Sequence, residues 1–345
     1  MKATYRQYIL NFKQPSGTSR GILKTKETWF IILEENGKKG IGECGILRGL
    51  SVDDLSDYED QLKWVCENIN LGLKDLYHQL QKFPSIQMGL EMAFKSLESE
   101  SAFVLFPSAF TEGKSAININ GLIWMGSEAF MKAQIKEKIN AGFHCLKLKI
   151  GAIDFDTELS ILKSIRNDFS AKDLELRVDA NGAFLPKYAL EKLNRLSTFD
   201  LHSIEQPIAI NQWDDMAKLC EKTPIPIALD EELIGVFSQT NKETLLQHIQ
   251  PQYIILKPSF IGGFSGTKSW INLAESRKIG WWITSALESN VGLNAIAQFT
   301  YSLNTIAPQG LGTGGLFTNN FDSPLEVKSG KLHYNLKTDW NFNLS

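Results

Sequence analysis

The sequence predicts an α/β protein in which a parallel (β/α)₈-type barrel follows an α+β domain. Two patterns support this prediction. After Ala116, short apolar segments alternate with amphipathic helical stretches over roughly 200 residues, whereas about 250 are typical of such a barrel. Before Gly113, strand-like segments come first and helix-like segments follow. Such segregation of strands from helices is typical of an α+β domain.

Three segments divide the 345 residues of the chain. We expect residues 1–113 to form the α+β domain, 114–319 the barrel, and 320–345 a tail that returns to the N-terminal domain. The tail has a hairpin pattern, with a turn at Ser329-Gly330 between two apolar runs. A doubly wound open sheet is the alternative for the middle segment, but no glycine-rich phosphate motif follows an early strand.

Within the first segment the pattern predicts an antiparallel meander followed by two helices. Ser51 and the residues after it are predicted to cap the first helix, and Pro84-Ser85 precedes the second. The expected strands are residues 5–12, 28–33 and 39–44, and the expected helices are residues 55–67 and 86–98.

In the barrel segment the expected strands are short and apolar, and the helices between them are amphipathic. The predicted strands are residues 117–123, 145–150, 174–179, 203–205, 225–230, 253–257, 282–285 and a weak eighth strand near 310–314. The predicted helices are residues 128–141, 155–168, 188–196, 242–248, 267–276 and 290–302.

The composition of the chain excludes several classes of protein. A net charge of −3 gives no reason to expect nucleic acid or an anionic membrane as a partner. The four cysteines form no CxxC pair, so reduced thiols are favoured over zinc or thioredoxin-like chemistry. The N-terminus has no signal-peptide core, and no run reaches the roughly 18–20 apolar residues of a membrane span. We expect a cytoplasmic protein that acts on a small molecule. The sequence leaves open whether it forms a homo-oligomer.

Charged or polar residues occupy the C-terminal ends of successive predicted strands. Neighbouring members of the series are 25 to 30 residues apart, which is about one β/α unit per step. All of them are therefore expected at the C-terminal mouth of the barrel, where such enzymes have their active sites. The series is Lys149, Asp179, Glu205, Asp230, Lys257 and Ser285.

The three acids of this series predict a metal site. Carboxylates at 4 Å repel by about 4 kcal/mol per pair at an effective dielectric near 20. Three such pairs approach the whole stability of a domain, about 5–15 kcal/mol. Ion pairs with the lysines and with Arg177 are the alternative. Three acids at successive strand ends favour a bound cation, and an all-oxygen site favours Mg²⁺ or Mn²⁺ over zinc.

The lysines predict proton transfer. In the strand that contains Cys145, Lys147 and Lys149, alternate side chains share a face, so both lysines point inward. A cation lowers the pKa of a neighbouring lysine, which can then act as a base. Lys149 and Lys257 come from opposite sides of the expected barrel and suit abstraction of a proton α to a carboxylate. Lys147, one layer deeper, is expected to hold carboxylates and to tune the pKa of Lys149.

At this point the sequence resembles the enolase superfamily, in its branch related to muconate-lactonizing enzyme. The resemblance covers nearly the whole chain and implies a modified TIM barrel with a capping domain. It implies that Asp179, Glu205 and Asp230 bind Mg²⁺ and that Lys149 and Lys257 are the acid/base catalysts, supported by Lys147, Asn181 and Glu231. The matching motifs are Lys147-Leu148-Lys149, Asp179-Ala180-Asn181, Glu205-Gln206-Pro207, Asp230-Glu231 and Lys257-Pro258.

Within that branch the chain is similar to the o-succinylbenzoate synthases. The similarity rests on residues 17–24, 84–93, 256–259 and 284–289. It implies syn dehydration of 2-succinyl-6-hydroxy-2,4-cyclohexadiene-1-carboxylate, for menaquinone synthesis, through a metal-stabilised enediolate. Lys149 would remove the α-proton and protonate the departing hydroxyl, while Lys257 stays cationic. The expected substrate-binding residues are Arg177 and Ser285, which would help to bind the carboxylate, together with Ser19 and Arg20.

Three other functions are alternatives. N-acylamino acid racemases of this branch use the same two lysines. Dipeptide epimerases are less favoured, because residues 310–315 contain no acid that could hold a substrate ammonium group. A non-catalytic, metal-stabilised binding module is the alternative from another class.

Overall fold

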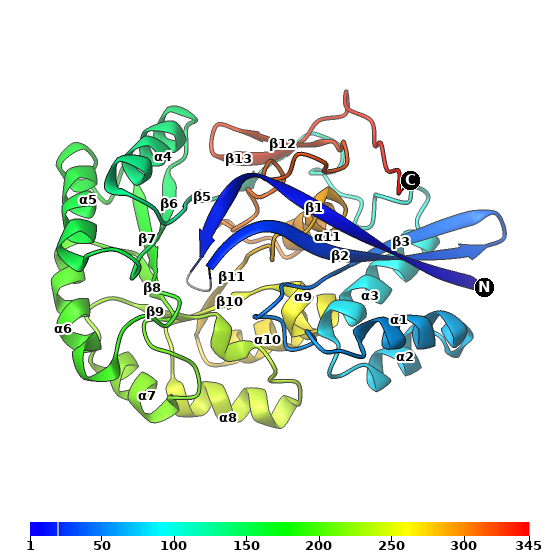
Figure 1. Cartoon of the computed structure of the whole chain (residues 1–345), viewed down its shortest axis with the longest axis horizontal. Helices are drawn as coiled ribbons and strands as arrows, with labels where there is room; N and C mark the ends of the chain where they lie inside the picture. The colour runs from blue at the N-terminus through cyan, green and yellow to red at the C-terminus, as the bar shows by residue number, and fades with distance from the viewer. Residues whose placement is uncertain (19–20, 345) are drawn as a thin grey trace.

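The computed structural model describes residues 1–18 and 21–344. Its centre is a curled parallel sheet of seven strands in the order β11-β10-β9-β8-β7-β6-β5 (Figure 1). Sequence neighbours are neighbours in the sheet, as in a (β/α) barrel. The strands are β5 (Gly121–Ile123), β6 (Cys145–Lys149), β7 (Glu175–Asp179), β8 (Ser203–Glu205), β9 (Ile227–Leu229), β10 (Tyr253–Leu256) and β11 (Gly280–Ile283). The predicted barrel class is confirmed.

The predicted eighth strand near residues 310–314 is reduced to two isolated bridges. Gln309 pairs with Ile119, and Gly310 pairs with Thr284, which follows β11. Main-chain hydrogen bonds from Gln309 N to Asn118 O (2.8 Å) and from Ser285 N to Gly310 O (3.0 Å) join the two edges of the sheet. A Cβ at residue 310 would overlap the Thr284 side chain, so this close approach requires glycine. Two residues therefore take the place of the eighth strand.

Helices follow most of the barrel strands and cover the outside of the sheet (Figure 1). The predictions for 155–168 and 290–302 match the observed bounds. The helix α7 and the short helix α9 were not predicted, although Met216, Leu219 and Cys220 give α7 a buried stripe at helical spacing. The helices are α4 (Glu128–Asn140), α5 (Phe155–Asp168), α6 (Pro186–Leu196), α7 (Trp213–Lys222), α8 (Gln239–Ile249), α9 (Pro258–Ile261), α10 (Gly263–Ser276) and α11 (Asn290–Ser302), with 3₁₀ turns η2 (Ser197–Phe199) and η3 (Glu231–Leu233).

The N-terminal part is an antiparallel sheet in the order β1-β2-β3, as predicted. The long β1–β2 hairpin crosses in front of the barrel (Figure 1). Helix α3 packs on β3 so closely that a Cβ at Gly42 would overlap the main chain at Gly89. The elements are β1 (Lys2–Thr18), β2 (Gly21–Glu35), β3 (Lys38–Gly45), α1 (Tyr58–Glu67), η1 (Ile69–Leu71), α2 (Leu73–Gln79) and α3 (Pro84–Glu98).

The predicted cap at Ser51–Asp54 is wrong for the first helix, which begins at Tyr58. Instead, Asp53 accepts hydrogen bonds from Ser85 N at 2.9 Å and Ser85 Oγ at 2.6 Å. Ser85 lies in the first turn of α3, whose free N–H groups attract a carboxylate. Asp53 therefore caps the second helix through a tertiary contact.

The C-terminal tail contacts both parts of the chain. It forms the hairpin β12 (Leu325–Lys328) and β13 (Lys331–Tyr334), and β13 pairs with β4 (Ile117–Asn118). Further on, the ring of Phe342 lies 5.3 Å from that of Phe30 in β2. The predicted strand over 117–123 is thus two strands in two different sheets. The domain limits at 113/114 and 319/320 stay predictions. None of the described helices has the length and apolarity of a membrane span.

Candidate active site

A cavity of about 760 Å³ lies at the C-terminal ends of the barrel strands. The barrel contributes polar side chains to its wall, among them Lys147, Lys149 and Lys257. The N-terminal part covers it with the β1–β2 hairpin, which contributes Leu23, and with the loop after β3 (Figure 1). That loop contributes apolar Leu47 and Leu50. The N-terminal part also contributes Lys13, Gln14 and Arg48. A cavity with apolar walls and a few convergent polar groups is typical of a small-molecule site.

The three predicted acids lie together beneath this cavity, at the ends of three neighbouring strands. Asp179 ends β7, Glu205 ends β8, and Asp230 follows β9. Their exposed fractions are 0%, 2% and 2%. Lys147 reaches two of them: its Nζ is 2.9 Å from Asp179 Oδ2 and forms an ion pair with Glu205. Lys147 also lines the cavity, and its supporting role stays a prediction.

Because the three acids lie close to one another and to the lysines, the pKa values of their carboxyls shift in different directions. Burial and the carboxylates of Asp179 and Asp230 raise the pKa of Glu205 well above its usual range. Burial alone would also raise the pKa of Asp179, but the ammonium groups of Lys147 and Lys149 hold it well below its usual range. The pKa of Asp230 is lowered in the same way, mainly by Lys257 and Lys147 acting against burial. The acids therefore need positive charge, or a proton, between them.

The two predicted catalytic lysines approach the acids from opposite sides. Lys149 Nζ donates to Asp179 Oδ2 at 2.6 Å and to Asn181 Oδ1 at 2.8 Å. Lys257 follows β10, four strands away in the sheet order from β6, which ends at Lys149, and forms an ion pair with Asp230. Each lysine side chain is only 13–14% exposed. Two shielded amines thus flank one space.

Asn181 links this arrangement to Glu231. Its amide Nδ2 donates to Glu231 Oε1 at 2.9 Å, while its main-chain N donates to Asp179 Oδ1 at 2.9 Å. Its φ of 44° lies in the left-handed region, which asparagine tolerates better than most residues. The strand-to-helix turn after β7 therefore orients Asp179 and Lys149 together.

Of the four predicted substrate-binding residues, the structure places Ser285 at the cavity and Arg177 away from it. Ser285 lines the cavity, and its Oγ lies 2.6 Å from Thr313 Oγ1. Arg177 is not among the residues that line it, so its predicted role has no support. Its Nε donates to Glu175 Oε1 at 2.7 Å, and its guanidinium lies 4.3 Å from the ring centre of Trp282. Arg177 is two residues before Asp179 on an inward face, one layer deeper. Ser19 and Arg20 lie outside the described residues.

The residues present fit a divalent cation by their chemistry. As placed among residues 1–18 and 21–344, no group of three His, Cys, Asp or Glu side chains has the arrangement of a formed metal site. The ammonium groups of Lys147 and Lys257 contact the acids instead. However, Glu205 Oε1 is buried and accepts no hydrogen bond from a described residue. Asp179, Glu205 and Asp230 form an all-oxygen donor set, which suits Mg²⁺.

Sequence reasoning missed the residues that loops bring to the cavity. Asn120 precedes β5, and Thr313 lies in the glycine-rich stretch after Gly310. Both are largely buried, at 6% and 8% exposed. No strand-end spacing marks them. A polar residue among glycines at 310–315 was the one usable signal, and it does not specify where the side chain lies.

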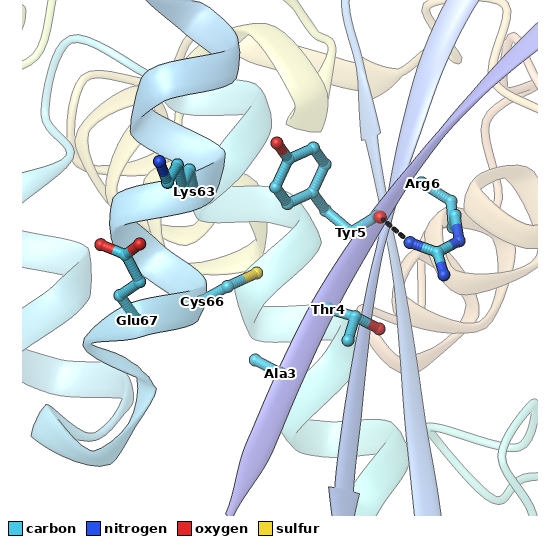
Figure 2. Close-up of a pocket in the computed structure, with 7 residues that line it drawn as sticks. All are labelled: Ala3, Thr4, Tyr5, Arg6, Lys63, Cys66 and Glu67. Carbon is cyan, nitrogen blue, oxygen red and sulfur yellow. Dashed lines mark hydrogen bonds between the residues drawn. The ribbon is translucent and has the colours of Figure 1, made fainter.

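A second hollow, of about 430 Å³, lies between β1 and α1 (Figure 2). Its walls include Tyr5, Cys66 and Glu67, and Cys66 points from the helix towards the strand (Figure 2). Burial raises the pKa of the Cys66 thiol to about 11, so it is not a reactive thiolate near neutral pH.

Comparisons with known proteins agree with this architecture. A family described as "Enolase C-terminal domain-like" matches residues 130–337, and one described as "MenC, N-terminal domain" matches residues 2–97. The barrel and its cover thus define an enolase-type protein.

Among individual relatives, the o-succinylbenzoate synthase of Desulfotalea psychrophila is 47% identical over 96% of this chain and 98% of its own. The crystal structure of MenC from the same organism has a TM-score of 0.86 at 43% identity, covering 96% of this chain and 99% of its own. The L-Ala-D/L-Glu epimerase of Bacillus subtilis has a TM-score of 0.83 at 20% identity, covering 100% and 98%, which supports the fold alone. The chain belongs to the o-succinylbenzoate synthase (MenC) family of the enolase superfamily.

Proposed function

We propose that this protein is an o-succinylbenzoate synthase. The reaction is the syn dehydration of 2-succinyl-6-hydroxy-2,4-cyclohexadiene-1-carboxylate to o-succinylbenzoate, a step of menaquinone synthesis. Identity of 47% over nearly the full length to an enzyme of that name carries the proposal. The two largely buried lysines, which contact Asp179 and Asp230 from opposite sides, support it.

Asp179, Glu205 and Asp230 would hold a divalent cation, Mg²⁺ in preference or Mn²⁺. Such an ion supplies positive charge for the substrate carboxylate and for the charge that develops there as the α-proton leaves. Glu205 Oε1 is buried and accepts no hydrogen bond from a described residue, and the three carboxylates repel one another. Both observations support this assignment.

Lys149 would be the base. As a neutral amine it takes the α-proton, the C–H electron pair moves into the ring, and the resulting ammonium returns a proton to the departing hydroxyl. Water leaves from the same face on which the proton was removed, so one side chain serves both steps. Asn181 and Asp179 orient the Nζ, at 2.8 Å and 2.6 Å.

Lys257 would remain an ammonium on the other face and balance the developing negative charge. Its contact with Asp230 and its position across the sheet from Lys149 support that role. Lys147 would keep Asp179 and Glu205 in place from below. Ser285 would contribute a hydroxyl to substrate binding.

The experiment is a dehydration assay with the purified full chain and Mg²⁺, followed by product absorbance. We expect turnover, and a loss of at least about 10³-fold in Lys149→Ala, since acid–base groups contribute roughly 10²–10⁴-fold. Lys163 is an exposed lysine of α5, so Lys163→Ala is the matched control and should leave turnover unchanged.

A parallel incubation of an N-succinylamino acid in deuterated buffer tests the racemase alternative. Exchange of the α-proton without any dehydration of the cyclohexadiene would overturn the proposal in favour of the racemase. Unchanged turnover in Lys149→Ala would remove Lys149 from its role. Absence of both reactions with Mg²⁺ retained would favour a binding module.

A further inference from the structure

A buried charged cluster lies between the N-terminal sheet and the barrel, and the mechanism above does not use it. It consists of Lys26 in β2, Glu43 in β3 and Glu288 in the loop after β11. These residues are 4%, 1% and 1% exposed. Charged side chains are rarely buried to this extent unless they are paired. None of the three is among the residues that line the cavity.

The three side chains converge on one point. A Cβ at Gly45 would lie 3.1 Å from Lys26 Nζ, 3.4 Å from Glu288 Cγ and 3.9 Å from Glu43 Oε1. A Cβ at Gly292 would lie 2.8 Å from Glu43 Oε2 and 2.8 Å from Glu288 Cβ. Because Gly45 and Gly292 have no side chain, the three charged groups can occupy this space.

Within this space, electrostatic attraction rather than hydrogen bonding holds the Lys26 side chain. Its Nζ is buried and makes no hydrogen bond within the described chain. The carboxylates of Glu43 and Glu288 surround it and oppose the lowering of its pKa by burial. Removal of a counter-charge from such a site leaves an uncompensated buried charge, which is strongly destabilising.

Glu43 joins the N-terminal sheet to helix α11. Its carboxylate accepts hydrogen bonds from Ser289 N at 2.9 Å and Gly292 N at 2.8 Å, and from Ser289 Oγ at 2.5 Å. Thr28 Oγ1 donates to it from β2 at 2.8 Å. A carboxylate at the first turn of a helix satisfies free N–H groups and interacts favourably with the helix dipole. The sheet therefore provides the cap of a barrel helix.

Glu288 joins two segments that reach the cavity. Its Oε1 accepts a hydrogen bond from Ser259 Oγ at 2.6 Å, and Ser259 is two residues after Lys257. Its Oε2 accepts from Ala286 N at 2.7 Å, next to Ser285. Leu287, between Ala286 and Glu288 in the sequence, has a φ of 62°. This conformation is strained for a leucine and needs support from its surroundings.

We propose that Lys26, Glu43 and Glu288 are positioning residues for the proposed dehydration. Through them the N-terminal sheet sets the placement of Lys257 and Ser285. Glu288 holds both segments, and Lys26 and Glu43 hold Glu288 against the cover of the cavity. Misplacement of a reacting group by about 1 Å can cost on the order of 10²-fold in rate. The functional part of this inference rests on the proposed function.

The test compares Glu288→Gln with Glu91→Gln. Glu91 makes the same kind of contact, because it accepts from Phe264 N at 2.5 Å and Ser265 N at 3.2 Å at the start of α10. Neither of those two residues lines the cavity. We expect Glu288→Gln to lower kcat at least tenfold with KM within threefold, and Glu91→Gln to change kcat less than threefold.

The double variant Lys26→Met/Glu288→Gln should be no less active than Glu288→Gln, because the two charges act as a unit. If Glu288→Gln does not fold, Lys26→Gln carries the same comparison. Equal kcat losses in the Glu288 and Glu91 variants would overturn the inference.

A readout without substrate separates this inference from the proposed function. Amide hydrogen exchange in residues 256–261 and 284–292 should be faster in Glu288→Gln and Glu43→Gln than in wild type, and unchanged there in Glu91→Gln. This result holds even if wild type does not dehydrate the cyclohexadiene. Unchanged exchange in both segments would refute the positioning role.

Discussion

We predict that the buried carboxyl of Asp53 lowers the free energy of unfolding by an amount that increases with pH. It is 0% exposed, and burial raises its pKa to about 6 from 3.8. Its Oδ2 accepts both hydrogen bonds from Ser85, while its Oδ1 has no partner in the described chain. Because the folded-state pKa lies above the unfolded one, folding is favoured with the proton bound. Stability should therefore fall as the pH rises from about 4 to about 6.

The size of the effect follows from the shift. A rise of about two pKa units corresponds to about 3 kcal/mol, at 1.36 kcal/mol per unit. With an unfolding entropy near 2.1 cal/mol/K per residue, this corresponds to roughly 4 °C in Tm for a chain of this length. Asp53→Asn keeps an acceptor for Ser85 but does not titrate. The Tm of the variant relative to wild type should therefore rise by roughly 3–4 °C between pH 4 and pH 7.5.

Circular dichroism melts at four or five pH values measure this difference. The matched control is Asp54→Asn, since the neighbouring Asp54 is paired with Arg48 and its pKa is lowered despite partial burial. Because the folded-state pKa of Asp54 lies below 3.8, the stability from this pair is lost only below about pH 4, so the Tm difference between Asp54→Asn and wild type should stay nearly constant from pH 4 to pH 7.5. Parallel pH curves for wild type and Asp53→Asn would refute the reasoning.

Three other predictions concern the barrel. Arg177→Met should lower Tm, because Glu175 loses its partner, yet change KM less than about threefold; a large rise in KM would return Arg177 to the substrate site. Burial lowers the pKa of Lys242 to about 8, so Lys242→Met should stabilise the protein most below pH 8, with the difference fading towards pH 10; urea midpoints at pH 7 and pH 9.5 check this trend. Mg²⁺ at about 100 times its Kd should add about 2.7 kcal/mol, hence roughly 4 °C in Tm, and the increase should disappear in Asp230→Asn; an unchanged Tm in wild type would argue against the metal site.

Much of the barrel was predictable because its signals are local. Each strand is a short apolar run, and residues such as Asp179 and Glu205 end their runs at regular spacing. Parallel strands bring their C-terminal ends to one edge, so spacing along the chain becomes proximity in space. The same reasoning gave Lys149 and Lys257 their opposite sides.

Other features depend on contacts between distant residues. The eighth strand was expected from the regular repeat, but two bridging residues at Gln309 and Gly310 join the sheet edges instead. Arg177 has the correct inward parity for the mouth, yet Glu175 and Trp282 hold it one layer below. Asp53 has a helix-capping pattern for the segment that follows it, but it caps α3.

The sequence by itself determined the fold class, the order of the barrel strands and the set of two lysines and three acids. These depend on side-chain periodicity and strand-end position, which are properties of the chain read along its length. Only the tertiary structure decided which loops line the cavity, which charges pair beneath it and how the N-terminal sheet holds Glu288. Those outcomes depend on distances between segments up to about 250 residues apart, as from Glu43 to Gly292, and no local pattern encodes such distances.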